Sequence, residues 1–359
     1  MNKVRESTYM QWAKLQSGGK FSLAPSGLEN YSIKDLPISI EDLEISGNSI
    51  YGYEPLLQAL ATKYKVDSNS VVLATGTSMA NHLAMASLLE PGDEVLIEQP
   101  TYDPILAVAQ YLGAKIKRFP RRFEDGYQIN PEDIKKAITP QTKLIILTNL
   151  HNPTGTFTSE AILSQIGEIA YGKAYVLVDE VYLESMFEKT PQSAFHLGSN
   201  FIITNSLTKV YGLSGLRCGW ILANPELAKK MWLLNDLFGV MPPHPAELLS
   251  VIALKNLDKI ATKAKNLLTK NHLLINQFLD NQKNLATVRP DFGTVIFPKL
   301  KNGNVEKLCL LLKEKYDTVV VPGKFFESPD HFRIGLGINS KILSSGLSSL
   351  ALALALAEL

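Results

Sequence analysis

The chain has 359 residues, which is enough to bury a large core and favours two domains or one large one. With 45% hydrophobic and 20% charged residues and a net charge of +1, the composition is that of an ordinary globular protein in water. So even a charge balance gives no reason to expect a surface for nucleic acid or for an acidic membrane.

The N-terminal segment, residues 1–45, has charges scattered through its first 21 positions. It lacks the apolar core of a signal peptide, so we expect no secretory leader. We expect this segment to pack with the C-terminal part of the chain rather than to form a domain of its own.

The central part, residues 46–244, contains short apolar runs separated by amphipathic stretches such as 79–90 and 158–171. Strands that are apolar throughout and joined by helices are typical of a largely parallel sheet covered on both faces. The runs therefore predict an α/β domain whose strands span residues 71–75, 93–98, 114–119, 143–149, 174–180, 201–205 and 219–223.

The pattern changes near residue 245, where a long helical stretch, 245–282, precedes shorter strand candidates at 294–299, 318–321 and 332–337. This order predicts a smaller α+β domain over residues 245–359. The apolar C-terminal run, 347–359, is far shorter than the ~20 residues that a membrane span needs, so we expect a terminal helix docked on the body.

The two cysteines, Cys218 and Cys309, form no spaced set of metal ligands. Two thiols in a chain of this length indicate a reducing compartment rather than a disulfide framework. We expect a cytoplasmic protein that binds small molecules and neither nucleic acid, membrane nor a structural metal.

Ligands of parallel sheets bind beyond the carboxyl ends of the strands, which directs attention to the residues after each apolar run. Gly76, Thr77 and Ser78 follow the run 71–75 and open a helix. Unpaired N–H groups and the helix dipole make such a start a binding site for an anion, most naturally a phosphate. A plain helix cap by Thr77 or Ser78 is the alternative.

Two further strand ends carry polar groups. Asn152 lies in His151-Asn152-Pro153-Thr154-Gly155, which is either a tight turn or an amide directed at a ligand oxygen. Asp179 ends a buried strand, where a carboxylate needs a partner: a magnesium ion, a helix cap or a protonated ring nitrogen. Tyr182, three positions further on, could reach the same ligand, whereas His151 is expected to be a core histidine.

The stretch "NSLTKVYGLSGLRCGW", residues 205–220, follows another buried strand. Lys209 in this small, flexible loop can form a Schiff base with an aldehyde if its amine loses its proton, which burial and nearby cations promote. Ser206 and Arg217 suit a phosphate, and Arg217 could bind it through two parallel hydrogen bonds.

Together, these strand ends predict one ligand with a phosphate, an aldehyde, a phenolic oxygen and a basic ring nitrogen. Pyridoxal 5′-phosphate has all four groups. The ordered set Gly-Thr-Ser, Asn-Pro-Thr-Gly, Asp-x-x-Tyr, Ser-x-x-Lys and Arg resembles that of the class I/II aminotransferases, which use this cofactor. The resemblance implies the fold type I architecture: a large domain with a mostly parallel seven-stranded sheet between helices, and a smaller α+β domain.

The resemblance also implies a role for each matching residue. Lys209 would hold the cofactor covalently and move the proton of the reaction. Asp179 would keep the pyridine nitrogen protonated, and Tyr182 and Asn152 would hydrogen-bond the phenolic oxygen. The phosphate would be held by the group at the first helix start, Gly76, Thr77 and Ser78, together with Ser206 and Arg217.

Three assignments depend on the resemblance more loosely. Tyr102 matches the aromatic residue that stacks on the cofactor ring, and Arg333 matches the arginine that binds the substrate carboxylate beside Asn152. Tyr51, or alternatively Tyr53, resembles the tyrosine that a neighbouring subunit lends to the phosphate. The resemblance therefore implies a homodimer with shared active sites.

The implied reaction is the transfer of an amino group between an L-amino acid and a 2-oxo acid by a ping-pong mechanism. A lyase, decarboxylase or cyclising synthase on the same scaffold is the alternative. The donor side chain is left open: Arg289 is a candidate second arginine for a dicarboxylate, while the segments 23–31, 291–295 and 321–327 are candidate pocket linings.

Overall fold

The centre of the molecule is one seven-stranded sheet, here described from a computed structural model that covers residues 6–356. The strand order is β2-β8-β7-β6-β5-β3-β4, and β8 runs antiparallel to both of its neighbours while the other pairs are parallel. The strands are β2 (Val71–Thr75), β3 (Glu94–Gln99), β4 (Lys115–Pro120), β5 (Thr142–Thr148), β6 (Tyr175–Asp179), β7 (Phe201–Ser206) and β8 (Cys218–Leu222).

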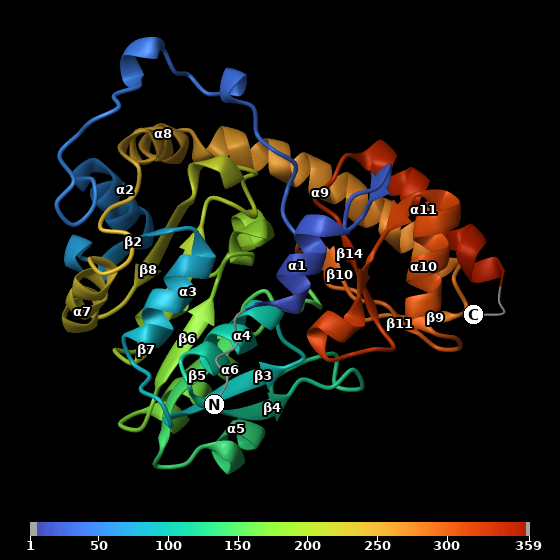
Figure 1. The fold of residues 1–359 in the computed structure, drawn as a ribbon, viewed down its shortest axis with the longest axis horizontal. Coiled ribbons are helices and arrows are strands. Elements are labelled where there is room, and N and C mark those ends of the chain that lie inside the picture. The colour runs from blue at the N-terminus through green and yellow to red at the C-terminus, as the bar shows by residue number, and fades with distance from the viewer. Residues whose placement is uncertain (1–5, 357–359) are drawn as a thin grey trace.

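All seven strands predicted from apolar runs are therefore present, and the mostly parallel sheet is confirmed. The central strands are buried along almost their whole length because helices cover both faces of the sheet. Helix α3 packs on β7 and β8, α6 on β6 and α7 on β2 (Figure 1). The helices of this layer are α2 (Glu54–Tyr64), α3 (Thr77–Ala86), α4 (Asp103–Tyr111), α5 (Pro131–Ala137), α6 (Glu160–Ala170) and α7 (Pro225–Asn235).

A second body lies beside the sheet and has its own apolar cluster, which includes Leu23, Ile275, Leu308 and Leu343. Its helices pack on short strand pairs: β10 and β13 flank β14, and β9 pairs with β11. These elements are α9 (Leu257–Asp280), α10 (Val305–Tyr316), α11 (Ser340–Ala355), β9 (Leu285–Ala286), β10 (Val295–Ile296), β11 (Lys299–Leu300), β12 (Thr318–Val319), β13 (Val321–Pro322) and β14 (Phe332–Gly335).

The N-terminal segment joins this second body. It contains helix α1 (Thr8–Leu15) and strand β1 (Phe21–Ser22), and β1 pairs in parallel with β12. The segment then runs as an extended arch past α8 to α2, as the dark blue trace in Figure 1 shows. The N-terminal segment thus connects the second body to the body that contains the large sheet.

The predicted long helical stretch from residue 245 is two helices, α8 (His244–Lys255) and α9. The break lies at Asn256, whose side-chain amide donates to the carbonyl of Ile252 at 2.8 Å and whose backbone leaves the helical region. The apolar cluster of the sheet extends through Val251 and Ile260, so α8 packs with the large body.

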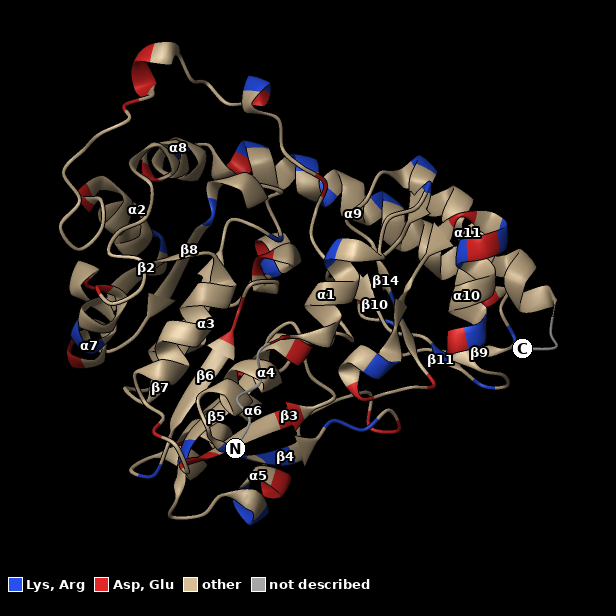
Figure 2. Ribbon diagram, viewed as in Figure 1, with Lys and Arg blue, Asp and Glu red and all other residues tan. Residues whose placement is uncertain are grey.

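The predicted C-terminal helix corresponds to α11, which packs on α9 and α10; residues 357–359 of the prediction lie outside the described part. Acidic and basic residues are interspersed over both bodies (Figure 2). Within residues 6–356 there is no helix with the length and apolar character required to span a bilayer.

Candidate active site

Lys209 lies in the loop after β7, at the carboxyl edge of the sheet. Its Nζ donates to the hydroxyl of Ser26 at 3.2 Å, and the hydroxyl of Tyr182 donates to the same oxygen at 2.9 Å. Ser26 belongs to the N-terminal segment, and its carbonyl accepts from Thr294 of the second body at 2.6 Å. One serine of the N-terminal segment therefore joins the predicted lysine and tyrosine and is itself held by the second body.

The surroundings of Lys209 lower the pKa of its amine. Burial is the largest effect that lowers the pKa of this lysine, and the positive charges of Arg333 and Arg217 lower it further. Tyr9 and Asp179 act in the opposite direction. A lysine with a lowered pKa is a better nucleophile and a better general base near neutral pH.

Asp179 is buried at the end of β6. Its Oδ2 accepts from the amide of Asn81 at 2.9 Å, and its Oδ1 accepts from the N–H of Val181 at 3.1 Å. Burial raises the pKa of Asp179 to about 6, while these hydrogen bonds oppose the rise. A cation brought next to this carboxylate would be strongly attracted, because few solvent molecules can screen it.

The residues predicted to bind an anion lie together at the start of α3. Gly76 has a positive φ of 86°, and the hydroxyl of Thr77 donates to that of Ser206 at 2.8 Å. Arg217 donates to the carbonyl of Thr75 at 3.1 Å, and a Cβ added at Gly76 would come within 2.3 Å of its Nη2. Ser78 is exposed on the first turn of the helix.

Arg333, on β14, is fully buried. Its Nη1 donates to Oδ1 of Asn152 at 2.9 Å, and its Nη2 donates to the hydroxyl of Tyr9 at 2.8 Å and to the carbonyl of Ala24 at 3.1 Å. Its Nε has no hydrogen-bond partner among residues 6–356. A buried guanidinium with an unused donor is suited to binding a carboxylate.

Tyr102 lies at the start of α4, close to this arginine. Its ring meets that of Tyr9 edge-on, with 5.5 Å between centroids, and its hydroxyl donates to Sδ of Met10 at 3.4 Å. Burial raises the pKa of Tyr102 well above its usual value, so the hydroxyl stays protonated. The predicted stacking residue therefore borders the cluster that contains Arg333.

Three other sequence predictions lie at the margin of this cluster. Tyr51 packs on Trp232 at 5.9 Å between ring centroids and is 43% exposed, and the N–H of Tyr53 donates to Glu247 at 3.0 Å. Neither contact is with the groups around Lys209. His151 is buried, as expected of a core histidine, with Nδ1 at 2.7 Å from the hydroxyl of Thr154.

Residues 44–350 match the family model for aminotransferase class I and II. The chain belongs to this family. It is 25% identical over 346 residues to capreomycidine synthase from Streptomyces vinaceus, covering 92% of this chain and 89% of that protein. It is 30% identical over 292 residues to histidinol-phosphate aminotransferase 2 from Haemophilus influenzae, covering 80% and 76%.

The fold of this class I and II aminotransferase family member also matches solved structures. A PLP-dependent aminotransferase from Streptococcus suis is 26% identical and superposes with a TM-score of 0.93, covering 99% of this chain and 98% of that one. The fold type I architecture is thereby confirmed, and family membership implies pyridoxal 5′-phosphate as the cofactor.

The residues present fit this cofactor. The start of α3, with Ser206 and Arg217, offers donors for a phosphate, and the contact with Arg217 leaves no room for a side chain at Gly76. Asp179 offers a buried anion for a protonated ring nitrogen, and the hydroxyl of Tyr182 lies beside Lys209 through Ser26. The donor set thus matches the phosphate, the ring nitrogen, the phenolic oxygen and the aldehyde.

Three residues of the site were missed as individuals. Ser26 lies in the segment 23–31 that the sequence marks as a pocket lining, but nothing singled out its hydroxyl. Asn81 follows Thr77 by one helical turn, so helical spacing could have placed its amide on the same face. No sequence signal points to Tyr9, which reaches Arg333 from 324 positions away.

Proposed function

We propose that the protein is an aminotransferase that moves an amino group between an L-amino acid and a 2-oxo acid by a ping-pong mechanism. The observation that carries the proposal is a group of three residues: Lys209, whose Nζ shares the hydroxyl of Ser26 with Tyr182, the buried carboxylate of Asp179, and the buried Arg333 with its unused donor. These are the groups that amino transfer from a carboxylated substrate requires.

The residues of this chain would divide the work as follows. Arg333, oriented by Asn152 and Tyr9, binds the substrate carboxylate and thereby places the α-carbon near Lys209. Lys209, as a neutral amine, takes the proton from that carbon and delivers it to a second carbon of the reacting system. Ser26 accepts from Nζ of Lys209 and from the hydroxyl of Tyr182, and so keeps Nζ in place while it carries the proton.

When bound, pyridoxal 5′-phosphate supplies an electron sink and a carrier for the amino group. Asp179 would hold its ring nitrogen, and Thr77, Ser206 and Arg217 would hold its phosphate. Asn81 and Val181 bond both carboxylate oxygens of Asp179 and so hold the orientation of this side chain.

A half-reaction without acceptor tests the proposal. The cofactor-loaded enzyme is mixed with single amino acids, and the cofactor spectrum and the released product are measured together. Amino transfer predicts one equivalent of 2-oxo acid per active site, matched by loss of the aldehyde absorbance. Continuous release of ammonia or carbon dioxide, with the aldehyde absorbance retained, would contradict it.

A PLP-dependent lyase, decarboxylase or cyclising synthase is the second candidate, because a synthase is among the similar proteins. The same half-reaction separates the two. A synthase or lyase would turn over many times without a 2-oxo acid acceptor, whereas an aminotransferase would stop after one turnover.

We also propose that the working unit is a homodimer. Exposed apolar side chains gather on the arch before α2 and on the segment after α7, including Ile50, Tyr51, Leu237 and Phe238, with Tyr51 at 43% and Leu237 at 76% exposure. Large apolar side chains exposed on two such segments favour coverage of this surface by a protein partner. Light scattering of the purified protein should give twice the monomer mass of 39.6 kDa.

In this dimer Tyr51, or alternatively Tyr53, would reach the phosphate of the neighbouring subunit. Mixing two inactive variants, Lys209→Ala and Tyr51→Phe, tests the arrangement. Hybrid dimers would regain one intact site in two if Tyr51 acts across the interface. No regained activity in proven hybrids would contradict the shared site.

A further inference from the structure

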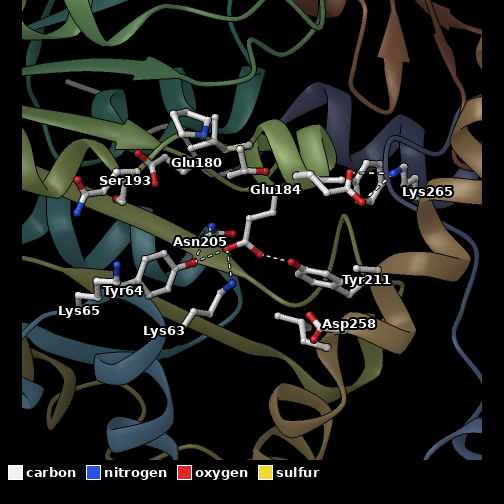
Figure 3. A pocket seen from close by; sticks show the side chains of 18 of the residues that line it. Lys63, Tyr64, Lys65, Glu180, Glu184, Ser193, Asn205, Tyr211, Asp258 and Lys265 are labelled. Atoms are coloured by element: carbon white, nitrogen blue, oxygen red, sulfur yellow. Dashed lines mark hydrogen bonds and ion pairs between the residues drawn. The ribbon is translucent and has the colours of Figure 1, made fainter.

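The carboxyl edge of the sheet has a second side, opposite Lys209. A cavity of about 750 Å³ lies there between the end of the sheet and α9. We name it the rear cavity; Figure 3 shows its lining, which includes Tyr64, Glu180, Glu184, Asn205, Tyr211 and Lys265. Successive side chains of a strand point to opposite faces, so Glu180 and Asn205 face this cavity while their neighbours Asp179 and Ser206 face the active site.

One carboxylate collects the hydrogen bonds of this cavity. Oε1 of Glu184 accepts from the hydroxyl of Tyr64 at 2.8 Å and pairs with Nζ of Lys63 at 3.0 Å. Its Oε2 accepts from the hydroxyl of Tyr211. The dashed lines in Figure 3 converge on Glu184 from α2 and from the loop after β7.

Each branch leads to a residue of the predicted cofactor site. Glu184 lies two positions after Tyr182, and Tyr211 lies two positions after Lys209. The hydroxyl of Tyr64 accepts from the amide of Asn205 at 3.2 Å, and Oδ1 of Asn205 accepts the N–H of Ser206 at 2.7 Å.

The loop that carries Lys209 is held on one side by backbone hydrogen bonds. It lies between β7 and the 3-10 turn Ser214–Leu216; Leu207 donates to the carbonyl of Cys218 at 3.0 Å, and Leu28 of the N-terminal segment donates to the carbonyl of Lys209 at 2.7 Å. Within residues 6–356, the side chain of Lys209 makes one hydrogen bond, at 3.2 Å. The contact between Tyr211 and Glu184 holds the loop from the opposite side.

We propose that Glu184 is a positioning residue, which fixes Lys209, Ser206 and Tyr182 from behind the active site. It touches neither substrate nor cofactor and acts through Tyr211 and Tyr64. The inference rests on the proposed function in one respect, since it takes Lys209 as the residue that holds the cofactor.

The two tyrosines are suited to this task. Burial, and next the negative charge of Glu184, raise the pKa of Tyr64 and of Tyr211 well above the usual value. Both hydroxyls therefore remain hydrogen-bond donors at any pH at which the enzyme works. Glu184 borders a cavity rather than close-packed core, so an isosteric substitution leaves no packing defect.

The test compares Glu184→Gln with Glu188→Gln. Glu188 lies in the same 3-10 segment, Leu183–Lys189, borders the same cavity and loses the same charge, but it pairs with Lys265 at 2.7 Å. Glu184→Gln removes the negative charge and replaces one of the two acceptor oxygens by an NH2 donor, so one tyrosine hydroxyl loses the acceptor to which it donates. Three quantities are measured in the cofactor-loaded enzyme: kcat, KM and the pH midpoint of the absorbance of the Lys209-linked cofactor.

We expect Glu184→Gln to lower kcat about tenfold by displacing Lys209, with less than about a twofold change in KM because Arg333 is untouched. The pH midpoint shifts as well, and Glu188→Gln changes none of the three quantities. Tyr211→Phe, which removes one oxygen, should produce the same midpoint shift, and the double variant should add little to it. If Glu184→Gln folds poorly, kcat and the pH midpoint of Tyr211→Phe alone test the inference.

Parental kcat and midpoint in Glu184→Gln or, if that variant folds poorly, in Tyr211→Phe would overturn the inference, as would equal shifts in Glu184→Gln and Glu188→Gln. These results would leave the proposed function intact. A parent protein whose Lys209 never forms the absorbing bond would overturn the proposed function first, and the inference with it.

Discussion

The two sides of the sheet edge differ in how completely their charged groups are paired. On the active-site side, Lys209 makes one hydrogen bond and Nε of Arg333 has no partner within residues 6–356. On the rear side, Glu184 has three donors, and Glu180 accepts the N–H of Ala194 at 2.8 Å. The cations of the active-site side thus keep unused donors, whereas these two carboxylates of the rear side are paired; Asp179 on the active-site side is paired as well, with Asn81 and Val181.

This difference separates groups that await a ligand from groups that hold the frame. An unpaired buried polar atom costs about 1–3 kcal/mol and persists where a ligand will pair it. The active-site side should therefore lose function without losing stability when it is mutated. Mutation of the rear side should change the stability of the protein, or change its function indirectly.

The largest effect is expected for Lys209→Ala. Activity should fall at least about 10³-fold, because both the covalent anchor and the proton carrier are removed. The free energy of unfolding of the cofactor-free protein should change by less than about 1 kcal/mol, since one hydrogen bond is lost. Lys265→Ala, which breaks a surface ion pair, is the control and should keep full activity. Parental activity in Lys209→Ala would contradict the assignment of Lys209 to the active-site side as anchor and proton carrier.

Arg333→Lys should lower kcat/KM about 100-fold, because lysine keeps the charge but loses the planar pair of donors. The loss should be confined to substrates with an α-carboxylate. A primary amine that lacks this carboxylate serves as the internal control, and its slow reaction should be unaffected. Equal losses for both substrates would mean that Arg333 is structural.

Gly76→Ala should weaken cofactor binding about tenfold, since the new methyl group displaces Arg217 from the anion site at the start of α3. The matched control is Gly92→Ala. Gly92 has a similar positive φ, 99°, but no atom within 4 Å of the added Cβ, so it carries the strain without the contact. Cofactor dissociation constants of both variants, measured by absorbance, should differ by this factor; equal constants would contradict the site.

The last prediction concerns stability rather than activity, at Glu180 on the rear side. Burial raises its pKa from 4.5 to about 7, so the folded protein binds a proton that the unfolded chain releases. The stabilisation is complete below about pH 4.5 and is lost as the pH rises to about 7. Glu180→Gln should reduce this decline in the free energy of unfolding by at most about 3 kcal/mol.

Urea unfolding of the cofactor-free protein at pH 5 and pH 7.5 measures the decline. Glu188→Gln serves as the control, since this exposed carboxylate has a lowered pKa and stays ionised across the range. Parallel curves for the parent and Glu180→Gln would show that the proton on Glu180 does not contribute.

The strands and the strand-end residues were predictable because their signals are local. A buried parallel strand is an apolar run, and Asp179, Ser206 and Lys209 follow such runs directly. The contributions of Tyr9 and Ser26 were not predictable, because they come from contacts with residues more than 150 positions away. The break at Asn256 was missed because an asparagine that bonds the carbonyl four positions earlier is compatible with either one helix or two.

The role of Glu184 shows the same limit from another direction. Its spacing to Tyr182 is visible in the sequence, but its partners Tyr64 and Tyr211 meet it only when α2 and the loop after β7 are brought together. Residues that frame a site through others carry no motif of their own, so a three-dimensional structure is needed to find them.

The central claim is that Lys209 holds the cofactor through its side-chain nitrogen. The protein is loaded with pyridoxal 5′-phosphate, reduced with borohydride and digested, and the modified lysine is located by mass spectrometry. We predict that the label lies on Lys209 and is absent from the Lys209→Ala variant. A label on another lysine, or none on this one, would contradict the account.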